Sequence, residues 1–316
     1  MGGLLRKRNF KLYFYTLIFA FLIFLLLSEN LGDRDAYLNW ILKVDKIIAS
    51  SHQGSLFFYP IAEPFWNYLL FFLKSVFEKP ELVLTIINLI VGSITAFCVL
   101  KNSNKSSLFS FIFLINIFIL SSSLNHVRSG MAMCLVLLTY DYPEFNKSFL
   151  SRIIRLSAFF IHMGTIIYIF IDYLKFFYIK SNKLFGRYSS FLLGLLTLIS
   201  SNLVFLILTK YAPSTETSLG RGSFVGFAFY FIILILILFS KAEERSKNYI
   251  SIILLSTYIS FYFTYPPVGR ILEMGYPFII ISVLNILITY KRLMYVLFLA
   301  GNLYGLFLNV NLLYVK

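Results

Sequence analysis

The sequence predicts an all-α, polytopic integral membrane protein. Apolar residues make up 59% of the 316 positions and charged residues only 13%, and the mean hydropathy is +0.81, a balance that soluble globular domains do not have. The apolar residues form runs long enough to cross a bilayer as helices. Short basic clusters separate these runs, so the formal net charge of +14 indicates membrane orientation rather than nucleic-acid binding. We expect one transmembrane domain over residues 1–316.

The first apolar run, residues 10–27, follows the basic cluster Arg6-Lys7-Arg8. It is long enough for a span and no small-residue cleavage site follows it, so we expect an uncleaved first helix with its N-terminus in the cytoplasm. Residues 29–62 then form the main periplasmic loop. Apolar residues spaced by three or four within that loop predict an amphipathic surface helix over residues 35–50.

The rest of the chain alternates apolar runs with polar or basic segments. The later apolar runs are 64–77, 80–100, 108–120, 131–140, 156–174, 188–209, 223–240, 249–263, 274–290 and 293–312. Counting every run gives about eleven spans. If every basic cluster is cytoplasmic, only nine runs cross, and residues 64–77 and 156–174 become re-entrant or broken segments. We prefer nine spans, because broken helices at membrane depth are common where they line a cavity. That arrangement places on the outer face Asp33, Asp35, Glu63, Arg128, Arg221, Arg270 and Glu273.

Arg128 is the residue around which we predict the functional site. It lies in a polar stretch, residues 121–132, between two apolar runs, together with Asn125. An arginine so close to hydrocarbon must find water, an anion or a carboxylate, because burying its charge unpaired is costly. Two interpretations stay open: Arg128 binds an anionic ligand, or it forms a salt bridge that only fixes helix packing.

Carboxylates near the first span are the next candidates. Asp33 and Asp35, followed by Tyr37, could deprotonate or anchor a sugar hydroxyl at the membrane surface, or could end a solvated loop. Glu63 precedes a proline at the predicted start of a helix. It could interact with the helix dipole as a cap, or point into the same outer site with Trp66 as a platform for a sugar ring.

Further candidates lie later in the chain. His162 is an ionisable residue deep in an apolar run, where it either bonds a neighbouring helix or marks a chain break that faces a cavity. Arg270 and Glu273 lie in a predicted outer loop, residues 264–273. They would form an ion pair if that end is helical; otherwise Arg270 is a second cation for a diphosphate. Arg221, between two glycines, is a third cation.

No nucleotide-binding loop, metalloprotease helix or nucleophile motif is present in the sequence. Cys98 and Cys134 both lie within apolar runs, so neither a disulfide framework nor a zinc site is expected. We therefore expect no cofactor and no metal. An enzyme of this kind would draw its activated substrate from the membrane as a lipid-linked phosphate.

Four short motifs together resemble the EpsG family of bacterial exopolysaccharide proteins, which is close to Wzy-type O-antigen or capsule polymerases. They are Gly32-Asp33-Arg34-Asp35-Ala36-Tyr37, Glu63-Pro64-Phe65, Arg128-Ser129-Gly130-Met131-Ala132 and Phe160-Ile161-His162-Met163-Gly164. They keep the family's order and approximate spacing over about half of the chain. Ser129 stands where family members often have Gln, and Met163 where they often have Ser or Pro.

The resemblance implies a GT-C-like glycosyltransferase in the bacterial inner membrane. It would join undecaprenyl-diphosphate-linked repeat units into O-antigen, capsule or exopolysaccharide on the periplasmic face, with a Wzz-type chain-length regulator as a partner. Arg128 and Arg270 would hold the leaving diphosphate, Asp33 or Asp35 would orient or deprotonate the acceptor hydroxyl, and His162 would complete the site. The alternatives are a glycan ligase, a flippase or transporter of lipid-linked oligosaccharide, and a membrane acyltransferase.

The predicted site has two parts. The predicted catalytic residues are Asp33, Asp35, Arg128 and His162, and the predicted substrate-binding residues are Tyr37, Glu63, Trp66, Asn125, Arg221, Arg270 and Glu273.

Overall fold

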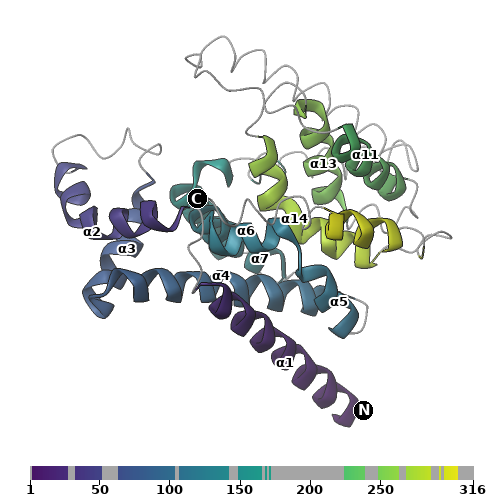
Figure 1. The fold of residues 1–316 in the computed structure, drawn as a ribbon, viewed down its shortest axis with the longest axis horizontal. Coiled ribbons are helices and arrows are strands. Elements are labelled where there is room, and N and C mark those ends of the chain that lie inside the picture. The colour runs from purple at the N-terminus through teal and green to yellow at the C-terminus, as the bar shows by residue number, and fades with distance from the viewer. Residues whose placement is uncertain are drawn as a thin grey trace. The chain divides into compact units, whose positions relative to one another are not determined.

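The computed structural model is helical throughout the residues it describes, which confirms the predicted fold class (Figure 1). The described residues are 2–27, 33–51, 63–103, 107–141, 149–165, 168, 171, 224–238, 248–262, 268–285, 292 and 295–304. Within them, Asn9–Leu26 and Pro80–Asn102 are long and apolar enough to cross a membrane, and one bent helix pair would make a third span. The total of nine to eleven spans stays a prediction, because runs such as 188–209 lie outside the described residues.

The chain divides into two compact units. One comprises Met1–Tyr168 with Leu303–Lys316, and the other comprises Ile169–Asn302. The first unit contains helices α1 (Gly2–Leu26), α2 (Arg34–Ser51), α3 (Pro64–Phe77), α4 (Pro80–Asn102), α5 (Ser107–Leu114), α6 (Ile117–Leu124), α7 (Val127–Asp141), α8 (Phe149–Ile161) and the 3-10 turn η4 (Met163–Thr165). The prediction of one transmembrane domain stays a prediction.

Helix α4 is the centre of the first unit, and α1, α2, α3, α5, α6 and α7 all pack against it. Its sequence is apolar over most of its length, begins with a proline at the first helical position and carries Lys101 in its last turn, three features that favour a helix with these ends. In Figure 1 the helix α1 crosses α4. Gly92 of α4 lies against Ile23 of α1, because a small residue lets two membrane helices approach closely.

The predicted amphipathic helix over residues 35–50 is confirmed as α2. It runs beside α3 in the same direction. This direction follows from the contacts between the two helices, in which later residues of α2 pair with later residues of α3. These contacts pair Tyr37 with Trp66, Trp40 with Asn67 and Asp45 with Lys74. Both helices therefore begin at the same end of the unit, where the candidate residues at the start of α2 and α3 lie.

The apolar run over residues 108–120 does not form one straight helix, because the structure divides it between α5 and α6, which are bent by 69° in a broken span or a re-entrant loop. Asn116 lies at the break and its side-chain oxygen accepts a hydrogen bond from the Phe118 amide at 2.8 Å. Asparagine is a preferred residue at a helix N-cap. The sequence signal for this break was thus one asparagine within an otherwise apolar run.

The second unit contains α11 (Phe224–Leu238), α13 (Tyr249–Phe261) and α14 (Val268–Asn285), and α13 packs against both of the others. The prediction that residues 264–273 form an outer loop is wrong in its second half, because α14 begins at Val268. Two prolines precede that residue in the sequence, and prolines are tolerated at a helix start. Glu273 is therefore a buried helical residue, 4% exposed, and not a loop residue.

The approach of α7 to α6 and α4 depends on Gly130. A Cβ atom at this position would lie 2.1 Å from the Ser122 carbonyl oxygen and 2.8 Å from Val91 Cγ1. The oxygen belongs to the backbone, so it cannot move aside as the end of a side chain can. A side chain at residue 130 would displace the first turn of α7.

We expect Gly130→Ala to destabilise the protein more than Gly92→Ala. Overpacking costs about 1–3 kcal/mol, and the Gly130 change should lie at or above the upper end because its clash is with backbone. At Gly92 the nearest atom is Ile23 Cγ1, 2.9 Å away on a side chain that can adjust. The thermal unfolding midpoints of both variants in detergent micelles measure the difference. Equal midpoints would contradict the role given to Gly130.

Candidate functional site

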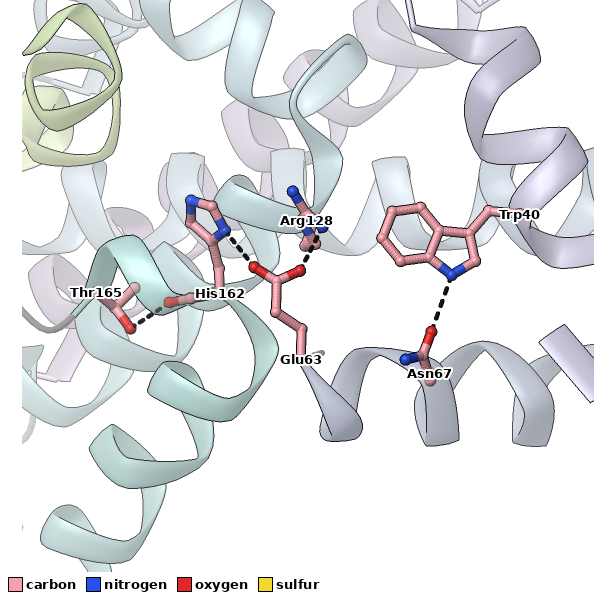
Figure 2. A network of polar contacts seen from close by, with 6 residues as sticks. All are labelled: Trp40, Glu63, Asn67, Arg128, His162 and Thr165. Carbon is pink, nitrogen blue, oxygen red and sulfur yellow. Dashed lines mark hydrogen bonds and ion pairs between the residues drawn. The ribbon is translucent and has the colours of Figure 1, made fainter. Parts of the chain in front are cut away.

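Glu63, immediately before α3, is the centre of a buried polar cluster (Figure 2). Its side chain is 8% exposed, and its carboxylate contacts two partners. Oε2 forms an ion pair with Nη1 of Arg128, in the first turn of α7. Oε1 lies 2.9 Å from Nδ1 of His162, directly after α8. The structure thus brings together three of the predicted site residues from three distant segments.

The backbone of Glu63 is in the left-handed region, with φ 48° and ψ 60°. Non-glycine residues adopt this conformation rarely and at some cost in free energy. Its side chain makes no capping hydrogen bond to α3, whereas its carbonyl oxygen accepts from the Trp66 amide at 3.0 Å. The strained backbone therefore accompanies a carboxylate that turns away from its own helix and toward Arg128 and His162.

Arg128 has a carboxylate partner, which is one of the three predicted outcomes of water, an anion or a carboxylate. Its guanidinium carbon also lies 5.1 Å from the centre of the Trp40 ring, a cation–π distance. Its Nε is buried and has no hydrogen-bond partner among the described residues. The salt bridge that one interpretation of Arg128 predicted is therefore present in the structure. The anionic-ligand interpretation stays a prediction, and the guanidinium keeps donor capacity for it.

Both interpretations of His162 find support, since the chain breaks there and its ring bonds Glu63 at the start of α3, while the cavity that such a break would face stays a prediction. Helix α8 ends at Ile161, and η4 begins at Met163. The His162 carbonyl accepts hydrogen bonds from the backbone amide and the hydroxyl of Thr165, at 3.0 and 2.8 Å. These bonds hold the backbone of His162 in place, and its imidazole is directed at Glu63 (Figure 2).

The remaining candidates of the first unit lie around this cluster. Asp33 and Asp35 are exposed, and Asp33 Oδ2 lies 3.9 Å from His126 Nε2. Tyr37 is buried, and burial raises the pKa of its hydroxyl, with the charge and backbone of Arg128 partly offsetting that shift. Tyr37 therefore stays protonated and close to Arg128. Each of two further candidates has a buried polar atom without a hydrogen-bond partner among the described residues, namely Trp66 Nε1 and Asn125 Oδ1.

Three predicted residues, Arg221, Arg270 and Glu273, belong to the second unit. Arg221 and the side chain of Arg270 lie outside the described residues, although the Arg270 backbone belongs to α14. Glu273 is buried in α14 of the second unit. Trp40 was not among the site residues predicted from the sequence, although it contacts Arg128. Its position three residues after Tyr37, on one face of an amphipathic helix, was an available signal.

The first turns of α2, α3 and α7 supply Tyr37, Trp66 and Arg128 to this region. Helix N-termini carry partial positive charge and free backbone N–H groups, so they favour negative groups nearby. The Glu63 carboxylate is one such group, and Asp35 lies in the first turn of α2. Among the described residues no group of three or more His, Cys, Asp or Glu could hold a metal ion.

We expect Arg128→Met to destabilise the protein strongly and the double variant Glu63→Gln, Arg128→Met to recover most of the loss. Removing one partner of a buried ion pair costs about 3–5 kcal/mol because it leaves the other charge unpaired, whereas replacing both partners costs far less. The two tryptophans of the chain, Trp40 and Trp66, both lie here, so intrinsic fluorescence during thermal unfolding in detergent reports on this cluster. A double variant no more stable than Arg128→Met would contradict the pairing.

The comparisons with known proteins bear on the resemblance. No curated protein and no solved structure matches the chain. The model of the EpsG family matches residues 12–315, a range that includes the four motifs and the Glu63–Arg128–His162 cluster that three of them supply. The family expected from those motifs is thereby confirmed, and this chain belongs to the EpsG family, which is linked to exopolysaccharide biosynthesis.

Proposed function

We propose that this EpsG-family protein is a membrane glycosyltransferase that polymerises lipid-linked oligosaccharide repeat units. Its substrate is a glycan carried on undecaprenyl diphosphate, and its product is a longer O-antigen, capsule or exopolysaccharide chain. The observation that carries the proposal is a half-buried arginine, Arg128, which the buried Glu63 carboxylate pairs with while it also bonds the ionisable residue His162. A cation, a carboxylate and an imidazole in one cluster suit the transfer of a sugar from a diphosphate.

Arg128 supplies the contact for the diphosphate. A guanidinium has five N–H donors in a planar fork that matches phosphate oxygens. Glu63 is paired with Nη1, while Nε has no partner among the described residues. The Trp40 ring lies over the guanidinium, with its centre 5.1 Å from the guanidinium carbon. As the sugar–diphosphate bond breaks, negative charge develops on the leaving oxygen, and a fixed cation stabilises it.

The acceptor glycan would bind at the groups around this cluster. Trp66 is fully buried and Tyr37 nearly so, and their rings pack against each other rather than offering a face to a sugar. Trp66 Nε1 and Asn125 Oδ1 are a buried donor and acceptor without a hydrogen-bond partner among the described residues, and we propose that sugar hydroxyls satisfy them. A buried polar atom without a partner is costly, so a hydroxyl that satisfies it gains affinity. Asp33 and Asp35 lie on the exposed side, where an incoming glycan would first meet the protein.

The packing of α2 and α3 supports the nine-span arrangement, in which residues 64–77 do not cross the membrane. Lys43 and Lys46 are exposed on α2, and such a helix lies at the membrane surface rather than inside the hydrocarbon. Because α3 runs beside it in the same direction, with Lys74 paired to Asp45, both ends of α3 belong on the side of the membrane that holds α2. The cluster then faces the periplasm.

Cysteine labelling tests this arrangement. The native Cys98 and Cys134 are both buried, so background labelling should be low. We expect cysteines placed at the exposed positions Asn39 and Lys79 to react equally with a membrane-impermeant maleimide added to intact cells with a permeabilised outer membrane. A cysteine at position 79 that reacts only after the inner membrane is opened would mean that α3 crosses.

The function itself is tested at Arg128. We expect Arg128→Ala and Arg128→Glu to abolish long chains and Arg128→Lys to retain a fraction of them, because loss of one transition-state donor costs about 10²–10³-fold in rate. Polymer length on a gel, at matched protein level, is the measurement. Arg152→Ala is the matched control, since Arg152 is exposed on α8.

Two results of that experiment would change the proposal. Normal long chains from all three Arg128 variants would remove Arg128 from the mechanism. Unchanged chain length together with lost transfer of the glycan to its final acceptor would identify a ligase instead of a polymerase.

A further inference from the structure

Glu63 and His162 form a buried carboxylate–imidazole pair, with Oε1 and Nδ1 at 2.9 Å. An ionised carboxylate can only accept hydrogen bonds, and the ion pair with Arg128 keeps Glu63 in that form. Nδ1 of His162 must therefore be the donor. In the neutral ring the other nitrogen, Nε2, then has no hydrogen and can accept a proton. Figure 2 shows that nitrogen on the side of the ring away from Glu63.

His162 is held both at its imidazole ring and at its backbone. Glu63 holds Nδ1, and the two hydrogen bonds from Thr165 hold the carbonyl of His162. The His162 side chain is 11% exposed. No described residue is bonded to Nε2, since the recorded hydrogen bond and ion pair of the ring both involve Nδ1. A group held in this way can act on a substrate without first being reorganised.

Asp33 and Asp35 compare poorly with His162 as proton acceptors. Both are exposed, with the Asp33 side chain 56% accessible, so water solvates them. Neither contacts the Glu63–Arg128 pair, whereas His162 contacts it directly. An imidazole is in general a stronger base than a carboxylate, because its ordinary pKa is higher and lies closer to the pH at which such an enzyme operates.

We infer that His162 is the general base of the reaction and that Glu63 is its positioning residue; this inference rests on the proposed function. The acceptor hydroxyl gives its proton to His162 Nε2, and the acceptor oxygen forms a bond to the anomeric carbon of the donor glycan. The bond from that carbon to the diphosphate breaks, and its electron pair leaves with undecaprenyl diphosphate beside Arg128. The imidazolium, stabilised by the Glu63 carboxylate, then releases its proton to water.

The test is steady-state kinetics of chain extension by purified full-length protein in detergent with lipid-linked repeat units. His162→Asn places an amide N–H near Nδ1, so it can keep the bond to Glu63 but lacks Nε2. We expect its kcat to fall about 10²–10⁴-fold, the range for loss of a general base. KM should change by no more than about threefold, because ground-state binding does not use Nε2.

The variants at Glu63 separate charge from shape. Glu63→Asp keeps the charge and should retain more kcat than Glu63→Gln, which keeps the size but not the charge. If His162→Asn does not accumulate as folded protein, this order (wild type, then Asp, then Gln) carries the test. Equal kcat for the Asp and Gln variants would overturn the positioning role of Glu63. Arg152→Ala, on the exposed face of α8, should match the wild type.

Two outcomes would overturn the role of His162. A raised KM with unchanged kcat for His162→Asn would make His162 a binding residue. Normal kinetics for His162→Asn together with a large loss of kcat for Asp33→Asn or Asp35→Asn would make an aspartate the base, and polymerisation would stand. Absence of chain extension by the wild-type protein itself would instead refute the proposed function, whatever the variants do.

Discussion

The first unit depends on one carboxylate. Glu63 is buried and ionically paired, and it joins the start of α3 to the start of α7 and the end of α8. A buried charge is tolerated only when its partners are close and well oriented, because the free energy lost by removing the charge from water exceeds the free energy gained from a poorly formed ion pair. The left-handed backbone of Glu63 is a further cost that the surrounding packing must offset.

Helix α4 makes this meeting of segments possible. It packs against six other helices of its unit, and glycines at its contacts allow the backbones to approach. Gly130 brings the first turn of α7 against Ser122 and Val91, two residues after Arg128. In lipid, helices gain little from hydrophobic association with one another, so small residues and polar contacts decide which faces meet. Close packing at Gly130 therefore also positions Arg128, in the same turn of α7, for its ion pair with Glu63.

The chemistry follows from where helices begin and end. Arg128 and Trp66 lie in first turns, Glu63 directly before one, and His162 directly after a last turn. Helix ends combine free backbone groups and dipole charge with side chains that can turn toward a neighbour. Such positions suit a substrate whose headgroup is an anion and whose tail stays in the bilayer. This agrees with membership of a family linked to exopolysaccharide biosynthesis.

The sequence by itself determined which segments are helical and which residues are out of place in an apolar setting. Apolar runs located α3 and α4, the spacing of apolar residues located α2, and isolated polar groups in apolar surroundings identified Arg128 and His162, because all three signals are local properties of the chain. Tertiary structure alone decided that Glu63 is the partner of Arg128 and of His162, and that Trp40 covers the guanidinium. It also decided that Glu273 is buried in α14. Those outcomes depend on distances between segments far apart along the chain, which are set by packing around α4 and within the second unit and leave no mark in a local pattern.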